Sequence, residues 1–253
     1  MKKKTKKTII ISSIVTVVLG VSVLLGLVFT GRYVGWGPFT YLAFDAHISN
    51  ILKKYDSNNR KQEIVFYGAS NFRLWEEMEE DMNPYIVQNH GFGGSTDVDL
   101  VEKAETLLYP YDPQIVVFQT GSNDYASKTC SDEEKIASGV EYKKEMFSIF
   151  HEKLPNAQFV VMAGILMPGR SQYDEIVKQI NKEIKEYALS CDYLTFVDSE
   201  KMTVNEDGTH KTELFIKDGI HLTHEARIMW ANDYIKPILK TVIENNNIQG
   251  VTK

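Results

Sequence analysis

The sequence predicts an α/β fold in which a parallel sheet carries helices on both faces, preceded by one N-terminal transmembrane helix. The sheet is predicted by short β-branched and aromatic runs that alternate with longer helical patterns beyond residue 61, as in strand–helix–strand units. The membrane helix is predicted by an apolar run near the N-terminus. The hydrophobic content of 43% suits a single domain with a full core.

The N-terminal segment has the features of a membrane anchor. Five of its first seven residues are Lys, and residues 9–29 contain no charged side chain. A helix of this length spans a hydrocarbon core of about 30 Å. The run is longer than the apolar region of a signal peptide and lacks a small-x-small site, which favours an uncleaved anchor over a cleaved signal. Its length and flanks also argue against a buried core helix.

Orientation follows from the lysines. Lysine-rich flanks remain in the cytoplasm, so we expect a cytoplasmic basic tail at residues 1–8, a transmembrane anchor at 9–30 and an extracellular catalytic domain of a single-pass cell-membrane protein. Residues 31–60 are expected to form a juxtamembrane linker and a short amphipathic helix. Tyr33 and Trp36 there either sit at the membrane interface or pack on the domain.

Residues 61–245 are predicted to form the one catalytic domain, and residues 246–253 a C-terminal tail. Its five strands are expected at Glu63–Tyr67, Tyr85–Asn89, Gln114–Thr120, Gln158–Ile165 and Tyr193–Val197. Its main helices are expected near Asp97–Leu108, Ser131–Lys153, Tyr173–Ser190 and Thr223–Glu244.

The charge of the predicted extracellular part excludes one class of partner. Beyond residue 30 the chain has 23 Lys+Arg and 34 Asp+Glu, a net charge of −11. Nucleic-acid grooves need clustered basic residues, so no nucleic-acid partner is expected.

The strand positions also place the two cysteines. Cys130 follows a strand and Cys191 precedes one, so they should lie at opposite edges of the sheet. A disulfide requires Cα atoms within about 7 Å, so we expect none between them.

Ligands of parallel sheets bind at the carboxyl ends of the strands. Ser70, Gly93-Gly94, Asn123-Asp124 and Met167-Pro168 all come just after a strand. Ser70 at a strand-to-helix turn can expose its hydroxyl and direct its backbone N–H at developing negative charge. By itself, however, a serine there is more typical of a turn or a helix cap than of a nucleophile.

A serine nucleophile needs a base with an orienting partner. The segment KDGIHLT places Asp218 three residues before His221, so that the carboxylate can accept a hydrogen bond from the imidazole and fix its tautomer. Taken alone, the segment is better explained by a surface histidine beside a turn aspartate.

Two further segments offer donors for an oxyanion. Gly94 in NHGFGGST can bring its backbone N–H close to a ligand, and Asn123 in QTGSNDY can offer its side-chain amide. The alternatives are a simple turn at Gly93-Gly94 and a helix cap at Asn123-Asp124. GFGGST lacks the lysine of a phosphate-binding P-loop.

Together, the segments GASN, GFGGST, GSND and DGIHLT resemble, in order, the four blocks of the SGNH hydrolases, the GDSL-type esterase and lipase family. The resemblance covers about Glu63 to Leu239. It implies a flavodoxin-like three-layer α/β/α sandwich and no cofactor or metal. It also implies roles for the matching residues: nucleophile Ser70, base His221 with its partner Asp218, and an oxyanion hole of Ser70 N–H, Gly94 N–H and the Asn123 amide.

The sequence departs from the family's Gly-Asp-Ser pattern at Ala69. The stretch Gly68–Trp75 is more similar to a subgroup with Gly-Ser-Ser-Ser followed by Ile-Arg-Leu-Trp, as is Glu213–Trp230. A rival interpretation is a metal site, since His221, His224 and Glu225 form H-x-x-H-E near Asp218. That spacing is not H-E-x-x-H and no third ligand is evident, so the metal site is not preferred.

The expected activity is hydrolysis of short acyl esters, acetyl above all, on cell-envelope or extracellular carbohydrate through an acyl-enzyme on Ser70. Two alternatives remain open: an O-acyltransferase that uses the same site on a cell-wall glycan, and a non-catalytic binding module. The substrate partner is thus an acylated small molecule or glycan. Seven side chains could line the cleft: Phe72, Arg73, Trp75, Tyr125, Met167, Arg170 and Tyr173.

Overall fold

A computed structural model describes residue 22 and residues 40–253. Its five parallel strands have the order β2-β1-β3-β4-β5, which is the flavodoxin-like order. The predicted α/β fold with a five-stranded parallel sheet is therefore confirmed. The strands are β1 Ile64–Gly68, β2 Val87–Gly91, β3 Ile115–Gln119, β4 Gln158–Met162 and β5 Leu194–Val197.

Helices connect the strands. The α-helices are α2 Thr40–Lys54, α3 Ser70–Arg73, α4 Met78–Asp81, α5 Asp97–Leu107, α6 Ser122–Ser127, α7 Asp132–Lys153, α8 Asp174–Ala188, α9 His224–Met229 and α10 Lys236–Asn246. The shorter 3₁₀ segments are η1 Tyr109–Tyr111, η2 Pro168–Tyr173, η3 Glu200–Thr203 and η4 Thr212–Leu214, and η5 Trp230–Ile235 is a π-helix.

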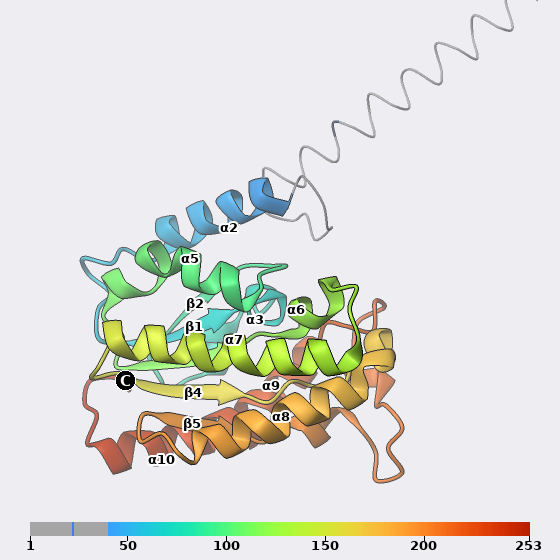
Figure 1. The fold of residues 1–253 in the computed structure, drawn as a ribbon. Helices are drawn as coiled ribbons and strands as arrows, with labels where there is room; N and C mark the ends of the chain where they lie inside the picture. The colour runs from blue at the N-terminus through green and yellow to red at the C-terminus, as the bar shows by residue number, and fades with distance from the viewer. Residues whose placement is uncertain (1–21, 23–39) are drawn as a thin grey trace, which may run out of the picture. The chain divides into compact units, whose positions relative to one another are not determined.

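Both faces of the sheet are buried, which explains why β1 and β3 are apolar without alternation. On one face, Phe66 and Val117 belong to a core cluster that includes Trp230. On the other face, Phe118 packs against Phe150 of α7 with ring centroids 5.6 Å apart. In Figure 1, α7 and α8 lie in front of the strands and α10 lies behind them.

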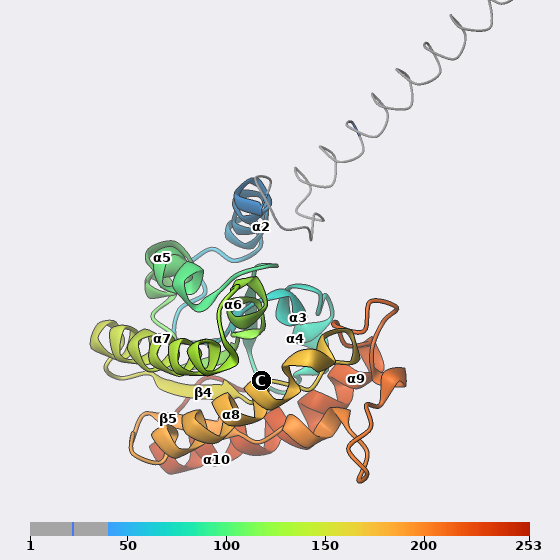
Figure 2. The ribbon, with the colours of Figure 1, turned by 45° about the vertical axis from the view of Figure 1, so that its right-hand side comes forward.

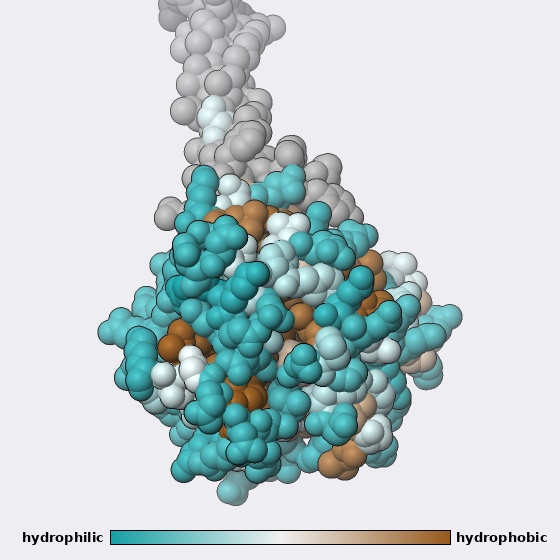
Figure 3. Space-filling view, turned by 90° about the vertical axis from the view of Figure 1, so that its left-hand side faces the viewer, coloured by the Kyte–Doolittle hydropathy of each residue, from teal (hydrophilic) through white to brown (hydrophobic). Residues whose placement is uncertain are grey.

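The amino and carboxyl ends of the strands differ in their surroundings. The face at the amino ends of the strands is mainly hydrophilic, with small separate apolar areas (Figure 3). At the carboxyl ends, the short helices α3, α6 and α9 gather, as Figure 2 shows. The carboxyl ends therefore carry the segments that the sequence singles out.

The last predicted helix is present and contains a π-helical segment. We expected one helix over Thr223–Glu244, and the chain forms α9, the π-helix η5 and α10 without an interruption between them. Pro237 stands in the first turn of α10. Proline has no backbone N–H for the α-helical ladder, which accounts for the wider π-helical turn just before it.

Two strand ends also differ from the prediction for identifiable reasons. β2 begins at Val87 because the preceding Ile86 N–H donates to Val251 O (2.8 Å) in the C-terminal segment. β4 ends at Met162 because the backbone of Gly164 bonds instead with the Asn181 side chain, at 2.7 Å through N–H and 2.8 Å through C=O.

The predicted basic tail at 1–8 and anchor at 9–30 lie outside the described residues, apart from Ser22, as does the linker up to residue 39. Within residues 22 and 40–253, no helix is both long enough and apolar enough to cross a membrane. Cys130 and Cys191 are both free thiols.

Candidate active site

Ser70 lies where β1 passes into α3. Gly68 ends the strand so close to β3 that a Cβ there would lie 2.2 Å from the carbonyl oxygen of Gln119, so only glycine fits. The Ala69 N–H donates to the same carbonyl at 3.0 Å. These backbone contacts fix the turn and leave Ser70, the first residue of α3, partly exposed at the carboxyl edge.

The structure brings Ser70, His221 and Asp218 into one chain of hydrogen bonds. His221 Nε2 lies 2.8 Å from Ser70 Oγ, and His221 Nδ1 lies 2.6 Å from Asp218 Oδ2. A carboxylate can only accept, so Nδ1 carries the proton and Nε2 is left to accept from the serine hydroxyl. This arrangement suits proton removal from Ser70.

The Asp218–His221 turn is held by its own backbone. Asp218 Oδ1 accepts from the N–H groups of Ile220 (2.8 Å) and His221 (3.0 Å). Gly219 has a φ of +66°, a conformation that favours glycine. An antiparallel bridge between Phe215 and Leu222 closes the loop.

The environment sets the charge states of the pair. Burial lowers the pKa of His221; the Asp218 hydrogen bond opposes this, and the positive charges of Arg73 and Arg170 add to it. Burial alone would raise the pKa of Asp218, but hydrogen bonds from His221 and Ile220 outweigh it, and the pKa is lowered. At neutral pH the histidine is therefore a neutral base beside an ionised carboxylate.

Asn71 is a functional residue that sequence reasoning missed. Its buried side chain accepts the backbone N–H of Leu222 at 3.1 Å, next to His221. It thereby joins the Ser70 turn directly to the histidine loop. The only signal in the sequence was that a polar residue stands immediately after Ser70.

The two expected oxyanion segments are also joined to each other. Gly94 has a φ of +87°, which glycine alone adopts readily. Asn123 is buried, and its Nδ2 donates to the carbonyl of Ser95 at 2.9 Å. An amide nitrogen has two protons, so the second remains for a ligand.

Arg170 completes this part of the site. Its Nη1 donates to Ser122 O at 2.6 Å, and Nη1 and Nη2 both lie 3.4 Å from Asn123 Oδ1. The sequence placed Arg170 among the possible cleft residues only, because nothing in it indicated a contact with Asn123. By contrast, Phe72 and Trp75 from the same group are fully buried in the core and do not line a cleft.

A buried charged cluster lies under the oxyanion segments. Lys143 Nζ is 3.1 Å from both oxygens of Asp97, whose side chain is 1% exposed. Asp124 Oδ1 accepts the Asp97 N–H at 3.0 Å. Burial, together with the negative charge of Asp97, raises the pKa of Asp124 to about 8. Asp124 is therefore protonated at neutral pH.

The histidines of H-x-x-H-E point to different partners. His224 Nε2 lies 2.9 Å from Asp81 Oδ2, whereas His221 faces Ser70 and Asp218. Among the residues that the structure describes, no group of three or more His, Cys, Asp or Glu side chains is arranged to hold a metal ion.

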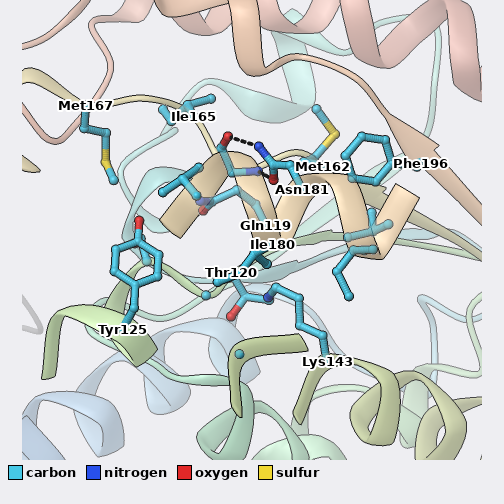
Figure 4. A pocket seen from close by; sticks show the side chains of 17 residues that line it. Gln119, Thr120, Tyr125, Lys143, Met162, Ile165, Met167, Ile180, Asn181 and Phe196 are labelled. Atoms are coloured by element: carbon cyan, nitrogen blue, oxygen red, sulfur yellow. Dashed lines mark hydrogen bonds between the residues drawn. The ribbon is translucent and has the colours of Figure 1, made fainter. Parts of the chain in front are cut away.

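A small cavity lies beside α6, the helix that carries Asn123. It is mainly apolar and has a volume of about 30 Å³. Figure 4 shows Tyr125 and Met167 on one side of it, Phe196 on the other and Lys143 below. Space of this size accommodates a few atoms.

The comparisons with known proteins agree with this geometry. Residues 64–226 match the GDSL-like Lipase/Acylhydrolase family. No curated protein matches the sequence.

Several solved structures share the fold. A putative platelet activating factor from Streptococcus pneumonia has a TM-score of 0.61 at 17% identity, over 75% of this chain and 92% of that one. A putative acylhydrolase from Bacteroides fragilis has a TM-score of 0.60 at 18% identity, over 80% and 96%. A carbohydrate esterase family 3 from Talaromyces cellulolyticus has a TM-score of 0.54 at 15% identity, over 72% and 98%.

Proposed function

The chain belongs to the GDSL-like lipase/acylhydrolase family and is an ester-hydrolysing serine hydrolase; from this premise we propose that it is a membrane-anchored esterase that removes short acyl groups from cell-envelope or extracellular carbohydrate. The observation that carries the proposal is the hydrogen-bonded chain Asp218–His221–Ser70.

In the proposed reaction, His221 Nε2 takes the hydroxyl proton of Ser70 as Oγ attacks the ester carbonyl carbon. Asp218 holds the imidazole and stabilises its charged form. The tetrahedral intermediate collapses as His221 returns the proton to the leaving alcohol, which leaves an acyl-enzyme on Ser70. Water, deprotonated by His221, then attacks this ester and releases the carboxylic acid and the free serine.

The negative charge of the intermediate is stabilised by the N–H groups of Ser70 and Gly94 and by the Asn123 amide. The contact between Asn123 Nδ2 and Ser95 O supports this role because it holds the amide beside the Gly94 loop. Donors fixed in advance stabilise the transition state without reorganisation, and loss of one typically costs about 10²- to 10³-fold in turnover.

Two considerations support a carbohydrate substrate. The Talaromyces cellulolyticus structure, described as a carbohydrate esterase, shows that the fold accommodates that substrate class. The acidic domain agrees with a neutral acylated glycan rather than a polyanion, since like charges repel.

The proposed location rests on the sequence. The lysines at the N-terminus and the uncharged residues 9–29 support a single-pass anchor with the catalytic domain outside the cell. Envelope glycans are then within its reach.

The proposal is tested with full-length protein in detergent. Release of free acetate from 4-nitrophenyl acetate and from O-acetylated glycans is measured beside Ser70→Ala, with 4-nitrophenyl esters of longer acids for comparison. We expect acetate release that falls with acyl length and disappears in the variant. Acylation of an added glycan without acetate release would show an O-acyltransferase instead. Equal activity of Ser70→Ala would contradict the mechanism.

A further inference from the structure

The segment Met167–Arg170 connects the two halves of the site. The Gly169 N–H donates to Gly219 O at 2.8 Å, and a Cβ at Gly169 would lie 2.5 Å from the carbonyl oxygen of Asp218. The next residue, Arg170, bonds to Ser122 O and Asn123 Oδ1 of α6. One short loop thus contacts both the turn that carries Asp218 and the helix that carries Asn123.

The contacts of Asn123 favour one orientation of its amide. The guanidinium of Arg170 can only donate, so the atom that faces it must be the oxygen. The carbonyl of Ser95 can only accept, so the atom at 2.9 Å from it must be the nitrogen. A rotated amide would lose both bonds and turn its oxygen toward Ser95 O.

Among residues 40–253, the carboxylate that acts on Arg170, that of Asp218, does so without forming a salt bridge with it. Within residues 40–253, Arg170 forms no ion pair at salt-bridge distance, and its hydrogen bonds are to oxygens of Ser122 and Asn123. The group is partly buried, so its field is less screened than on the open surface. It acts on the histidine as well, since its positive charge is one of those that disfavour protonation of His221.

Building on the proposed function, we propose that Arg170 is a positioning residue of the esterase site, which holds the Asn123 amide in its donating orientation and polarises it. Polarisation of the amide by the guanidinium strengthens the remaining Nδ2–H as a donor. Arg170 acts through Asn123 and without touching the substrate.

A double-mutant cycle tests this dependence. With 4-nitrophenyl acetate and full-length protein, kcat and KM are measured for Arg170→Gln, Asn123→Ala and the double variant. We expect Arg170→Gln to lower kcat about 10- to 100-fold with little change in KM, since the amide bonds the oxyanion more strongly than the ester. The double variant should match Asn123→Ala within about 2-fold. If the fold-losses in kcat of the two single variants multiply in the double variant, the proposal is overturned.

A pH profile separates this role from a merely structural one. His221 is faced by Asp218 on its own loop, by Ser70 and Arg73 on α3, and by Arg170 on η2. Removing only the Arg170 charge should move the acidic limb of kcat/KM to higher pH, whereas Arg170→Lys should keep it near its original position. An unmoved limb in Arg170→Gln would contradict the proposal.

Arg227→Gln is the matched control. Arg227 is a buried arginine that, like Arg170, donates to a backbone carbonyl, that of Leu74, at 2.7 Å. Its removal should leave the acidic limb unchanged and should show no coupling to Asn123→Ala; coupling as large as that of Arg170 would count against a specific role for Arg170.

A second readout does not depend on the natural substrate. The rate at which a fluorophosphonate labels Ser70 requires the same base and oxyanion donors, so the same cycle is measured with this reagent. If glycan esters are not hydrolysed, the proposed substrate fails while the labelling cycle still decides the role of Arg170.

Discussion

His221 Nε2 lies 2.8 Å from Ser70 Oγ, although 151 residues separate the two in the chain. Ser70 follows β1, an interior strand of the sheet, and His221 comes from the loop beyond the edge strand β5. The hydrogen bond from Leu222 N–H to Asn71 Oδ1 ties these segments together one residue away from each. The chemistry of the site therefore depends on a few contacts between distant parts of the sequence.

The acidic limb of the pH profile reports the base. The pKa of His221 is lowered from 6.5, so as the pH rises the imidazolium becomes the neutral base before pH 6.5 is reached. The value of kcat/KM should therefore rise with pH and reach a plateau by neutral pH. The measurement is kcat/KM for 4-nitrophenyl acetate from pH 4 to 8. A midpoint above 7 would show that His221 is stabilised in its charged form, contrary to the structure.

Asn71→Ala removes the contact between the serine turn and the histidine loop. The buried N–H of Leu222 loses its acceptor, which should cost about 1–3 kcal/mol in the free energy of unfolding, and turnover should fall because Ser70 and His221 are less well aligned. Denaturant unfolding and ester hydrolysis measure both effects.

The matched control is Asn59→Ala, at an exposed asparagine that bonds to Asp56. It should change neither quantity appreciably. Turnover in Asn71→Ala equal to that of the control would show that the contact does not align the site.

Lys143→Met leaves the carboxylate of Asp97 buried without its cation. Breaking a buried ion pair from one side typically costs about 3–5 kcal/mol, and Met keeps most of the apolar stem. Lys178→Met is the comparison, because Lys178 forms an exposed pair with Glu175 that is worth about 0–1 kcal/mol. Similar unfolding free energies for the two variants would contradict a structural role for the buried pair.

Asp124→Asn should change how stability depends on pH. The folded protein keeps a proton on Asp124 up to about pH 8, while the unfolded chain loses it near 3.8. Between these values the wild type binds a proton that its unfolded form lacks, so this group lowers stability as pH rises, by at most about 1.4 kcal/mol per pH unit.

Asparagine cannot ionise, so the variant lacks this contribution. The free energy of unfolding of Asp124→Asn relative to the wild type should therefore increase from pH 5 to 8 and level off above that. Parallel stability curves across the range would show that Asp124 is not held protonated.

The sheet was predictable because both of its faces are buried. Strands such as β1 and β3 then read as continuous apolar runs, and the topology brings their carboxyl ends to one edge. Ser70, Gly94, Asn123 and His221 could be singled out because each stands just after an apolar run or within a short polar motif.

Other features depend on contacts that no local pattern encodes. Asn71 bonds to Leu222, which is 151 residues away, and Arg170 bonds to Asn123, which is 47 residues away. The π-helical segment η5 is similar, because the apolar helical period continues through Thr223–Glu244 while Pro237 lacks the N–H of one α-helical hydrogen bond. The end of β4 is set by the side chain of Asn181, from the following helix.

The central claim is that Ser70 is the nucleophile, and covalent labelling tests it most directly. Full-length protein is treated with a fluorophosphonate, digested and examined by mass spectrometry. The account predicts one phosphonyl adduct on Ser70, slower labelling in His221→Ala and none in Ser70→Ala. An adduct on another serine, or ester hydrolysis that persists in Ser70→Ala, would contradict it.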